Sequence, residues 1–408
     1  MKNKFLAIVC LGLATLVGCG GGGGGSSNQS STPTPLAVGA TSYANKNTIS
    51  LDYPQITSLN GSLMRSVTFG DFFQDGSYSA FVAVNSGATS EIRFLKSLNG
   101  TWIDATSSLV PTSASRTICT VPTQAITADF NGDGKPDVYV SCKSSTSSSQ
   151  YFVLSQSGQL SYVVQALAVS GTNLNLQSWG AAAGDVDGDG DIDLVVTDND
   201  TVIVLENLNS GASWVKRTDL ITGQGSDGFP TKPRRVFLPP RAGGRPDLVV
   251  GGDGSLNNFN LVWIRNSNSL KSANSSVYNF NGNTLGGDSS VAQRYPVTAT
   301  DGVTSVSATI YDVVLSATNL LVLAKNVDVE SESTASKMYV LRYELPTAGT
   351  SLDLILGHEL IALPGSPSEY NPTGGFVSQF KLNSNGQLVA YDGACVSGQQ
   401  RCSFAVSP

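Results

Sequence analysis

Two segments of the chain align without a gap and share an acidic pattern, and this internal repeat constrains the fold more than any other feature. The first runs from Ala128 to Val140 (ADFNGDGKPDVYV) and the second from Gly184 to Val196 (GDVDGDGDIDLVV). Weaker copies of the pattern flank them, at Asp71–Ser79, Arg241–Asp247, Tyr311–Asp312 and Lys381–Gly386. Self-similarity at a spacing of about 55 residues is typical of a repeat architecture, in which each unit buries its apolar face against its neighbours.

Each copy is accompanied by runs of β-branched and aromatic residues between Gly, Asn and Ser clusters, which predict strands. Three of these runs end in Asn, namely Thr201–Asn207, Asn260–Asn266 and Asn319–Asn326. Four strands per unit predict an all-β fold, a β-propeller of six four-stranded blades, with seven blades as the alternative. The last unit lacks a fourth strand, and we expect Ile49–Tyr53 to supply it, because closing the ring removes exposed sheet edges.

The repeated pattern reads Asp-x-Asn/Asp-x-Asp-Gly-x-x-Asp, which places oxygen ligands at alternate positions of a tight loop. Hard oxygen ligands suit Ca²⁺, and the crowded carboxylates would repel one another without a cation. The sequence therefore predicts two calcium sites, whose ligands are Asp129, Asn131, Asp133, the Lys135 carbonyl and Asp137 in site A, and Asp185, Asp187, Asp189, the Asp191 carbonyl and Asp193 in site B. An EF-hand is excluded, because its twelfth loop position carries Glu, whereas Val140 and Val196 stand there.

Two of the weaker copies depart from this ligand pattern. One keeps Asp71 and Asp75 but has Phe and Ser at two of the ligand positions, so it retains only part of a third calcium site. The other has no loop carboxylates before its last position, and we hypothesise that an arginine replaces the cation there. The pair would be Arg241 or Arg245 with Asp247.

These loops resemble those of the FG-GAP/VCBS repeat family, the calcium-loop blades of integrin α-subunit propellers and of many bacterial surface proteins. The resemblance is strong for the two acidic copies and weak for the others. It implies a propeller over residues 41–408, with calcium bound in the hairpin between two strands of a blade, and it implies no particular activity. The Phe-Gly and Gly-Ala-Pro signatures of the family are largely absent, although Phe69-Gly70 precedes the first loop.

The N-terminus has the pattern of a bacterial lipoprotein. Residues 1–18 combine two lysines with a short apolar run, which predicts a signal peptide. The run ends in Leu-Val-Gly before Cys19, as in a lipobox, so Cys19 is predicted to be lipidated. Residues 19–40 are rich in Gly, Ser and Pro and read as a flexible tether. By resemblance to Gram-negative lipoproteins, Gly20 favours the outer membrane, on its periplasmic or its outer face, with the lipid as the only membrane contact.

Four cysteines remain beyond the predicted signal peptide and lipobox, an even number that suggests disulfides in an exported protein. The predicted pairs are Cys119–Cys142, within one repeat, and Cys395–Cys402, across a hairpin. The alternative is buried free thiols. A zinc or redox site is not expected, because no CxxC spacing occurs.

The composition argues for a binding protein. The formal net charge is −7, which argues against nucleic acid as a partner. The single histidine, His358, lies in a strand-like pattern, and no Gly-x-Ser-x-Gly elbow occurs. We expect a monomeric module that binds a protein or a glycan through its loops. The alternative is an extracellular polysaccharide lyase or hydrolase, because propellers carry both kinds of function.

Two further groups of residues are open to a functional and a structural interpretation. The tryptophans recur at related places in successive repeats, where inter-blade packing is favoured over sugar stacking; they are Trp102, Trp179, Trp214 and Trp263. The basic residues between positions 232 and 245 are interpreted as a solvated loop rather than a contact for an acidic polymer. They are Lys232, Arg234, Arg235, Arg241 and Arg245.

Overall fold

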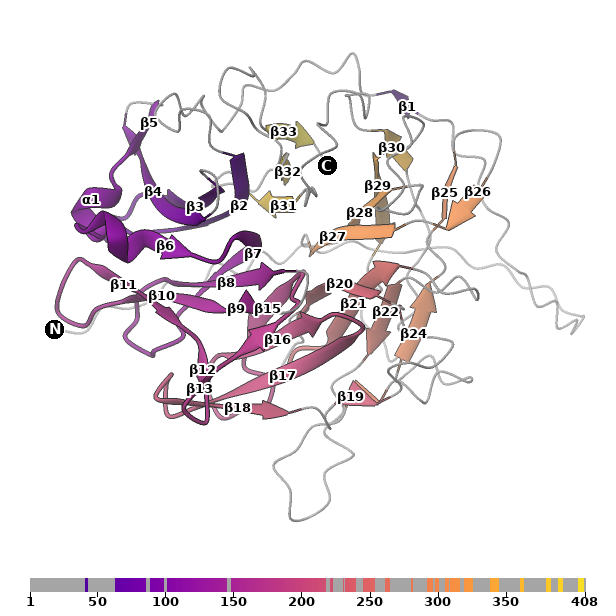
Figure 1. The fold of residues 1–408 in the computed structure, drawn as a ribbon. Coiled ribbons are helices and arrows are strands. Elements are labelled where there is room, and N and C mark those ends of the chain that lie inside the picture. The colour runs from indigo at the N-terminus through magenta and orange to yellow at the C-terminus, as the bar shows by residue number, and fades with distance from the viewer. Residues whose placement is uncertain are drawn as a thin grey trace, which may run out of the picture. The chain divides into compact units, whose positions relative to one another are not determined.

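A computed structural model shows an all-β chain (Figure 1). It describes residues 41–42, 63–85, 89–98, 101–144 and 148–217, and shorter segments, mostly strands, between 221 and 406. The predicted signal peptide and the whole tether lie outside these residues, as do Ile49–Tyr53. In the described part, the helices are α1 (Thr106–Leu109) and a 3-10 turn, Ser113–Arg116. None of the helices found there is long and apolar enough to span a membrane.

The strands form antiparallel meanders that follow the repeats in chain order. Sheet 1 contains β2 (Leu63–Gly70), β3 (Ser79–Asn85), β4 (Ser90–Leu98) and β5 (Thr101–Asp104), with β6 (Thr117–Ile118) beside β4. Sheet 2 contains β7 (Val121–Ala128), β8 (Asp137–Lys143), β10 (Tyr151–Ser155) and β11 (Tyr162–Ala166). Sheet 3 contains β15 (Ala181–Gly184), β16 (Asp193–Asp198), β17 (Thr201–Leu208) and β18 (Ser213–Arg217).

The later repeats give three more sheets. Sheet 4 contains β20 (Lys232–Phe237), β21 (Leu248–Asp253), β22 (Leu261–Ile264) and β24 (Ala292–Tyr295). Sheet 5 contains β27 (Thr309–Leu315), β28 (Asn319–Lys325), β29 (Met338–Glu344) and β30 (Leu360–Ala362), and β1 (Thr41–Ser42) pairs in parallel with β30. Sheet 6 contains β31 (Gln379–Leu382), β32 (Leu388–Tyr391) and β33 (Ser403–Val406).

Short two-stranded ladders connect these sheets. They are β9 (Ser148–Ser149) with β14 (Asn175–Leu176), β12 (Ala168–Val169) with β13 (Thr172–Asn173), β19 (Ile221–Thr222) with β23 (Phe280–Asn281), and β25 (Thr298–Thr300) with β26 (Ser305–Ser307).

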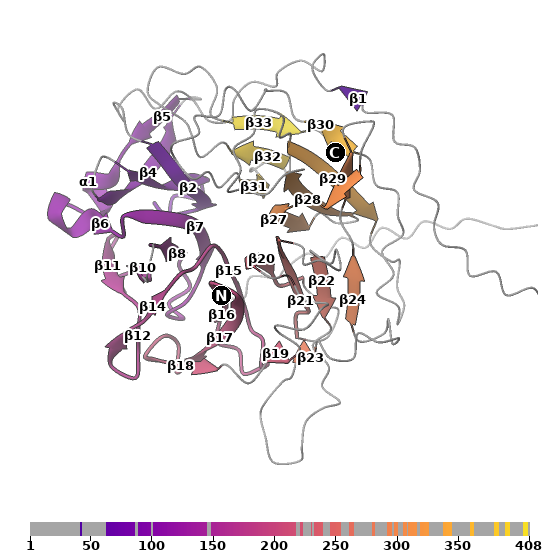
Figure 2. The ribbon, with the colours of Figure 1, turned by 45° about the vertical axis from the view of Figure 1, so that its right-hand side comes forward.

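The first strands of successive sheets contact one another in order. β2 contacts β7, β7 contacts β15, β15 contacts β20, β20 contacts β27, and β27 contacts β31, and Figure 2 shows these strands close together. Each sheet therefore packs on the next through its first strand, which is how the blades of a propeller pack. The chain is all-β and built of successive antiparallel sheets, as its repeats predict.

Four of these first strands share a β-bulge with one extra residue. The register shifts between Met64 and Ser66 in β2, Pro122 and Gln124 in β7, Pro233 and Arg235 in β20, and Ile310 and Asp312 in β27. A bulge turns the affected side chains and increases the local twist. Its recurrence at one place in four sheets indicates that these strands are structurally equivalent.

This equivalence corrects two interpretations made from the sequence. Tyr311–Asp312 resembles the end of the acidic pattern, which would place it in the second strand of a repeat, but it lies in β27, the first strand of its sheet. Three of the five basic residues, Lys232, Arg234 and Arg235, do not lie in a solvated loop, because they belong to β20. Arg234 and Arg235 are buried, with 4% and 1% exposure. Both patterns are too short to fix a strand's place in a sheet.

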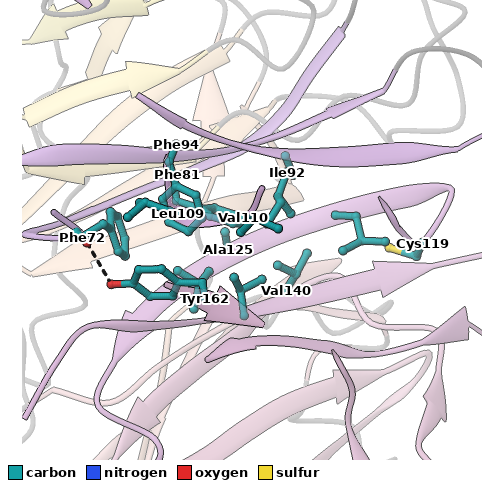
Figure 3. Packing of buried hydrophobic residues seen from close by; sticks show 14 of the residues in the cluster. Phe72, Phe81, Ile92, Phe94, Leu109, Val110, Cys119, Ala125, Val140 and Tyr162 are labelled. Atoms are coloured by element: carbon teal, nitrogen blue, oxygen red, sulfur yellow. Dashed lines mark hydrogen bonds between the residues drawn. The ribbon is translucent and has the colours of Figure 1, made fainter. Parts of the chain in front are cut away.

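Apolar clusters fill the spaces between successive sheets. Between sheets 1 and 2, aromatic rings from both sheets meet beside α1, and the Tyr162 hydroxyl donates to the Phe72 carbonyl at 3.2 Å (Figure 3). Phe130 and Trp214 belong to the next cluster, between sheets 2 and 3. Trp179 is half-buried beneath the cations of Lys143 and Arg234, and the side chain of Trp102 lies outside those that the structure describes. Trp214 and Trp263 are buried, with 6% and 7% exposure, in agreement with the packing interpretation for these two. Burial of these rings dominates the stability of such interfaces.

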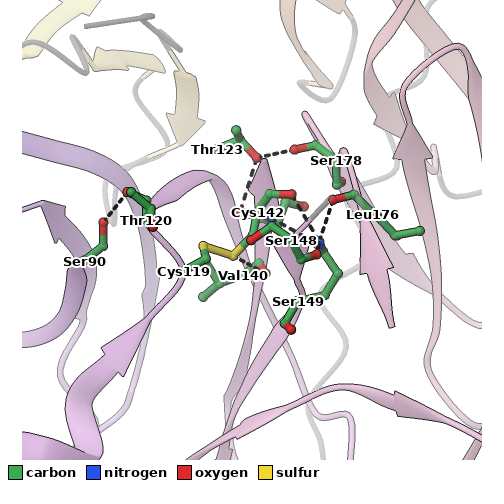
Figure 4. The surroundings of a disulfide bond; sticks show 12 residues. Ser90, Cys119, Thr120, Thr123, Val140, Cys142, Ser148, Ser149, Leu176 and Ser178 are labelled. Atoms are coloured by element: carbon green, nitrogen blue, oxygen red, sulfur yellow. Dashed lines mark hydrogen bonds between the residues drawn. A yellow bond between two sulfur atoms is a disulfide. The ribbon is translucent and has the colours of Figure 1, made fainter. Parts of the chain in front are cut away.

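The predicted disulfide between Cys119 and Cys142 is present, and both cysteines are buried (Figure 4). It joins the segment before β7 to the end of β8. Nearby, the Thr123 hydroxyl donates to the Ser178 carbonyl at 2.8 Å and so connects sheet 2 to the segment that leads into sheet 3. Cys395 and Cys402 lie outside the described residues.

Candidate metal centre

Both acidic loops close hairpins between the first and second strands of their sheets. Loop A (129–137) joins β7 to β8, and loop B (185–193) joins β15 to β16. Each contains two glycines with positive φ, Gly132 (70°) and Gly134 (79°) in loop A and Gly188 (81°) and Gly190 (98°) in loop B. Residues other than Gly rarely adopt such backbone φ angles. The glycines therefore allow the tight turn that brings the acidic side chains of the loop together.

Loop B gathers three carboxylates. Asp185, Asp187 and Asp193 each present an oxygen, and these three oxygens lie within 4.8 Å of one another. Calcium binds oxygen at 2.3–2.6 Å, so two ligands of the same ion lie up to about 5 Å apart. The three oxygens are therefore close enough together to contact a single calcium ion.

Backbone amides of loop B preorganise these side chains. The Asp185 carboxylate accepts hydrogen bonds from Gly188 N at 2.5 Å and Gly190 N at 3.1 Å. Asp187 accepts from Asp189 N at 3.0 Å, and Asp189 accepts from Asp191 N at 2.9 Å. These short local bonds fix the turn and leave further lone pairs on each carboxylate for a cation.

Asp193, the last residue of loop B, is fully buried. Its carboxylate accepts hydrogen bonds from Val186 N at 2.9 Å and from Asn207 N at 2.8 Å. Desolvation raises the pKa of Asp193 to about 7, and the nearby Asp187 and Asp189 charges act in the same direction. A cation in the loop would offset both effects, so the buried carboxylate is better matched to a metal-bound state than to an isolated anion.

Loop A repeats the turn but satisfies its carboxylates differently. Asp129 accepts from Asp133 N at 3.1 Å and Gly134 N at 2.7 Å. Asp137 is fully buried and accepts from Phe130 N at 2.9 Å, among other groups. Desolvation raises the pKa of Asp137 to about 6. At the three positions that form the loop B cluster, loop A carries Asp129, Asn131 and Asp137, so an amide replaces one of the three carboxylates.

Ser155 holds two of the loop A carboxylates together. Its backbone N–H donates to Asp137 at 2.6 Å, and its hydroxyl lies 2.8 Å from Asp137 Oδ1 and 2.9 Å from Asp133 Oδ1. The Asn131 amide donates to the Ser155 carbonyl at 3.1 Å. A hydroxyl therefore links Asp133 and Asp137 in loop A. The Lys135 ammonium points away from the loop and donates to two carbonyls of the β10–β11 turn, Gln156 and Gln159.

Ser155 and Asn207 were not predicted as site residues, yet they occupy the same place in their sheets, at or near the end of the third strand. Each donates its N–H to the buried aspartate of its loop. The Asn at the end of apolar runs such as Thr201–Asn207 was visible in the sequence, and this hydrogen bond gives the position its role in sheet 3.

In the partial third site, loop 1 (71–79), a lysine side chain from β4 pairs with one of the loop aspartates. Asp71 accepts from Asp75 N and Gly76 N, so the turn is preserved. The Ser79 hydroxyl replaces the last carboxylate and accepts from Phe72 N at 3.0 Å. The Lys96 ammonium lies 2.6 Å from Asp75 Oδ2, and this hydrogen bond is the main cause of a lowered Asp75 pKa.

The fourth repeat replaces metal ligands with other contacts. The carboxylate of Asp247 accepts a hydrogen bond from the indole N–H of Trp263 at 3.1 Å. The Arg245 guanidinium lies against loop B, where a Cβ added to Gly188 would be 2.9 Å from Arg245 Nε. Arg241 lies outside the described residues. The hypothesis that one of these arginines pairs with Asp247 stays a prediction.

Comparison with known families locates the repeat. Residues 129–196, which include both loops, match the model of the FG-GAP-like repeat. This segment is an FG-GAP-like repeat region. The match starts at the first aspartate of loop A and ends in β16, the strand after loop B, so the FG-GAP-like region holds the two predicted metal loops. No curated protein matches the chain.

Several solved structures are similar over most of the chain. A protein from Lactobacillus plantarum is 11% identical with a TM-score of 0.44, covering 85% of both chains. A putative 6-phosphogluconolactonase from Bacteroides uniformis is 12% identical with a TM-score of 0.41, covering 84% of this chain and 85% of its own. An Agrocybe aegerita lectin that recognises terminal N-acetylglucosamine is 13% identical with a TM-score of 0.38, covering 85% of this chain and 80% of its own. At these scores none assigns an activity to this chain.

Proposed function

We propose that loops A and B bind calcium, and that the ion in loop B is held by Asp185, Asp187, Asp189, the Asp191 carbonyl and Asp193. The spacing of the three carboxylate oxygens in loop B carries this proposal. Calcium would neutralise the crowded carboxylates and fasten the hairpin between β15 and β16. Because metal binding to a folded loop adds to the free energy of unfolding, its first role is to stabilise the FG-GAP-like region.

The sheets are proposed to be the blades of a six-bladed propeller. Two observations support this proposal. The first strands of successive sheets contact one another, and four of these strands share a bulge at the same place, as expected of equivalent units that pack one after another. Sheet 6 has three strands in the described part of the chain, and a strand from the N-terminal region would complete it.

At the level of the cell, the chain is proposed to be an outer-membrane lipoprotein that binds a protein or glycan ligand. Lipidated Cys19 and the tether of residues 19–40 would hold the calcium-stiffened domain at the membrane surface. The buried, pKa-shifted carboxylates, Asp137 and Asp193, accept hydrogen bonds from backbone amides of their own loops. Their environment is explained by loop structure, which favours binding over catalysis.

Thermal unfolding of the chain tests the metal assignment. We expect calcium to raise the Tm above its value in EDTA, and Asp187→Ala and Asp133→Ala each to remove part of that increase. Asp200→Asn, an exposed acid outside the loops, is the matched control and should respond to calcium as the unmodified chain does. A folded chain whose Tm is the same in EDTA and in calcium would overturn the proposal.

A glycan array, with a reducing-sugar release assay on the same polysaccharides, tests the binding role. Retention of a glycan without release of reducing ends supports a binding module. Release of reducing ends would instead make the chain a polysaccharide lyase or hydrolase.

A further inference from the structure

The turn after β17 connects the two acidic loops. On one side it is bonded to loop B, because Asn207 N donates to Asp193 at 2.8 Å. Ser210 donates both its N–H and its hydroxyl to the carboxylate of Asp191, each at 2.9 Å. Two acidic residues of loop B are thus hydrogen-bonded to a segment outside the loop.

On its other side the same turn lies on loop A. The Asn207 amide donates to the Phe130 carbonyl at 3.0 Å, although the two residues are 77 positions apart. A Cβ added to Gly211 would be 2.9 Å from that same carbonyl oxygen, and one added to Gly132 would be 2.9 Å from Ser210 Cβ. The backbones of loop A and the turn are therefore in close contact. A change in the conformation of one would displace the other.

The path between the buried carboxylates is short. Asp193 accepts from Asn207 N, the Asn207 amide donates to the Phe130 carbonyl, and Phe130 N donates to Asp137 at 2.9 Å. Asn207 is fully buried, and its side-chain oxygen accepts from Gly211 N at 2.6 Å, which holds the turn in one conformation. Two hydrogen-bonded residues separate the last ligand of one loop from the last ligand of the other.

We propose that the turn formed by residues 207–211 couples the two loops, so that calcium in one raises the affinity of the other. This inference rests on the proposed binding of calcium by both loops. An ion in loop B would fix Asp191 and Asp193, and with them the turn that forms one wall of loop A. The second ion then binds to a loop that is already ordered, so its binding costs less conformational entropy. This lower cost gives positive cooperativity. Direct repulsion between the ions has the opposite sign, so an increase in affinity can be assigned to the turn.

Calorimetric titration of the purified chain with calcium measures the coupling. Asp187→Ala removes site B and reports the affinity of site A alone, and Asp133→Ala reports site B alone. Because coupling is reciprocal, each site should bind calcium more weakly in the other's absence by the same factor, at least about five-fold. Hydrogen exchange of the segment 207–212 should slow when calcium fills site A alone in the Asp187→Ala chain.

Two variants test whether the turn carries the coupling. Ser210→Gly suits the positive φ of 52° at this exposed position, so the turn should still form. The variant loses the hydroxyl bond to Asp191 and the side-chain packing beside Gly132, and it keeps the N–H bond to Asp191. Asn207→Ala removes the bond to Phe130. In both variants we expect two calcium ions still to bind. The coupling factor, which is the change in affinity of one site when the other is filled, should fall towards one. If Asn207→Ala does not fold, Ser210→Gly decides. Ser108→Ala, an exposed hydroxyl in α1, is the control.

The outcomes separate this inference from the proposed function. Two ions that bind independently, with site A unaffected by Asp187→Ala, would overturn the coupling and leave calcium binding in place. The same holds if both turn variants keep the full coupling factor. A folded chain that takes up no calcium would overturn the proposed function and the coupling together.

Discussion

The Lys96 ammonium lies 2.6 Å from the Asp75 carboxylate, at the loop position where loops A and B carry their third ligand, Asp133 and Asp189. It also lies 5.2 Å from the centre of the Phe73 ring, which stands at the second ligand position. A cation from strand β4 therefore offsets the charge of Asp75, and a ring and a hydroxyl replace two of the oxygen ligands. Loop 1 keeps the hairpin without needing an ion.

This arrangement predicts that loop 1 gives no calcium response. In a chain carrying both Asp133→Ala and Asp187→Ala, we expect the same Tm in EDTA and in calcium, although Asp71 and Asp75 are intact. Differential scanning fluorimetry measures this directly. A remaining calcium-dependent shift that disappears on adding Asp75→Asn would show that loop 1 binds the ion after all.

A second prediction concerns the buried ion pair between sheets 4 and 5. Arg235 Nε lies 3.7 Å from Asp312 Oδ1, and the two side chains are 1% and 5% exposed. The Arg235 guanidinium also donates to the carbonyls of Trp179 and Arg234. Because removing one member of a buried pair leaves a desolvated charge, Asp312→Ala should lower the free energy of unfolding by about 3–5 kcal/mol.

Chemical denaturation measures this loss. Replacing both members, with Arg235→Met and Asp312→Leu together, should cost less than Asp312→Ala alone. Lys216→Ala is the control, because its partner Asp198 is 3.9 Å away and both side chains are about one-third exposed; its cost should stay below about 1 kcal/mol. Equal costs for the buried and the exposed pair would contradict the prediction.

The sequence predicts what is encoded locally. Each acidic loop is nine consecutive residues whose glycines fix the turn, so the pattern identifies the hairpin and its carboxylates before any fold is known. The Cys119–Cys142 pair also follows from spacing within one repeat. Strand order follows because the sheets are meanders, in which neighbours in the chain are neighbours in space.

What the sequence does not reveal depends on partners at variable distances. Ser155 lies 18 residues after its aspartate, whereas Asn207 lies 14 after its own. No fixed spacing therefore marks this position. Arg235 looks like part of a basic loop because its partner, Asp312, comes from another sheet. Charged residues on a first strand can only be recognised as buried once the packing of the sheets is known.

The disulfide gives a third prediction. Cys119 and Cys142 enclose a segment with a sequence separation of 23 residues. A cross-link of that length removes conformational entropy from the unfolded chain worth about 3 kcal/mol. Replacing both cysteines with alanine should lower the free energy of unfolding by about this amount, as measured by urea denaturation.

The same double variant isolates the effect of this bond. Dithiothreitol should destabilise the unmodified chain, and any destabilisation that remains in the double variant belongs to Cys395 and Cys402. The double variant could instead be as stable as the unmodified chain, and dithiothreitol could destabilise both chains equally. In that case the stabilising cross-link would not be the one between Cys119 and Cys142.

The fourth prediction concerns pH. Burial raises the pKa of Asp193 from 3.8 to about 7, so between these values the folded state binds more protons than the unfolded state. In EDTA, the stability contributed by this group is fully present below pH 3.8 and is lost as the pH rises through 7. The carboxylate must be ionised to hold calcium, so the metal and the proton compete for it.

We therefore expect the affinity of loop B for calcium to fall as the pH is lowered from 8 to 5.5, by up to about ten-fold per pH unit below 7, since one proton leaves Asp193 for each ion bound. Titration calorimetry in the Asp133→Ala chain, repeated in buffers of different ionisation enthalpy, measures both the affinity and the protons released. Loop A, studied in the Asp187→Ala chain, should show its fall about one pH unit lower, because burial raises the pKa of Asp137 only to about 6. Affinities that do not change across this range would mean that neither buried carboxylate gives up a proton to the ion.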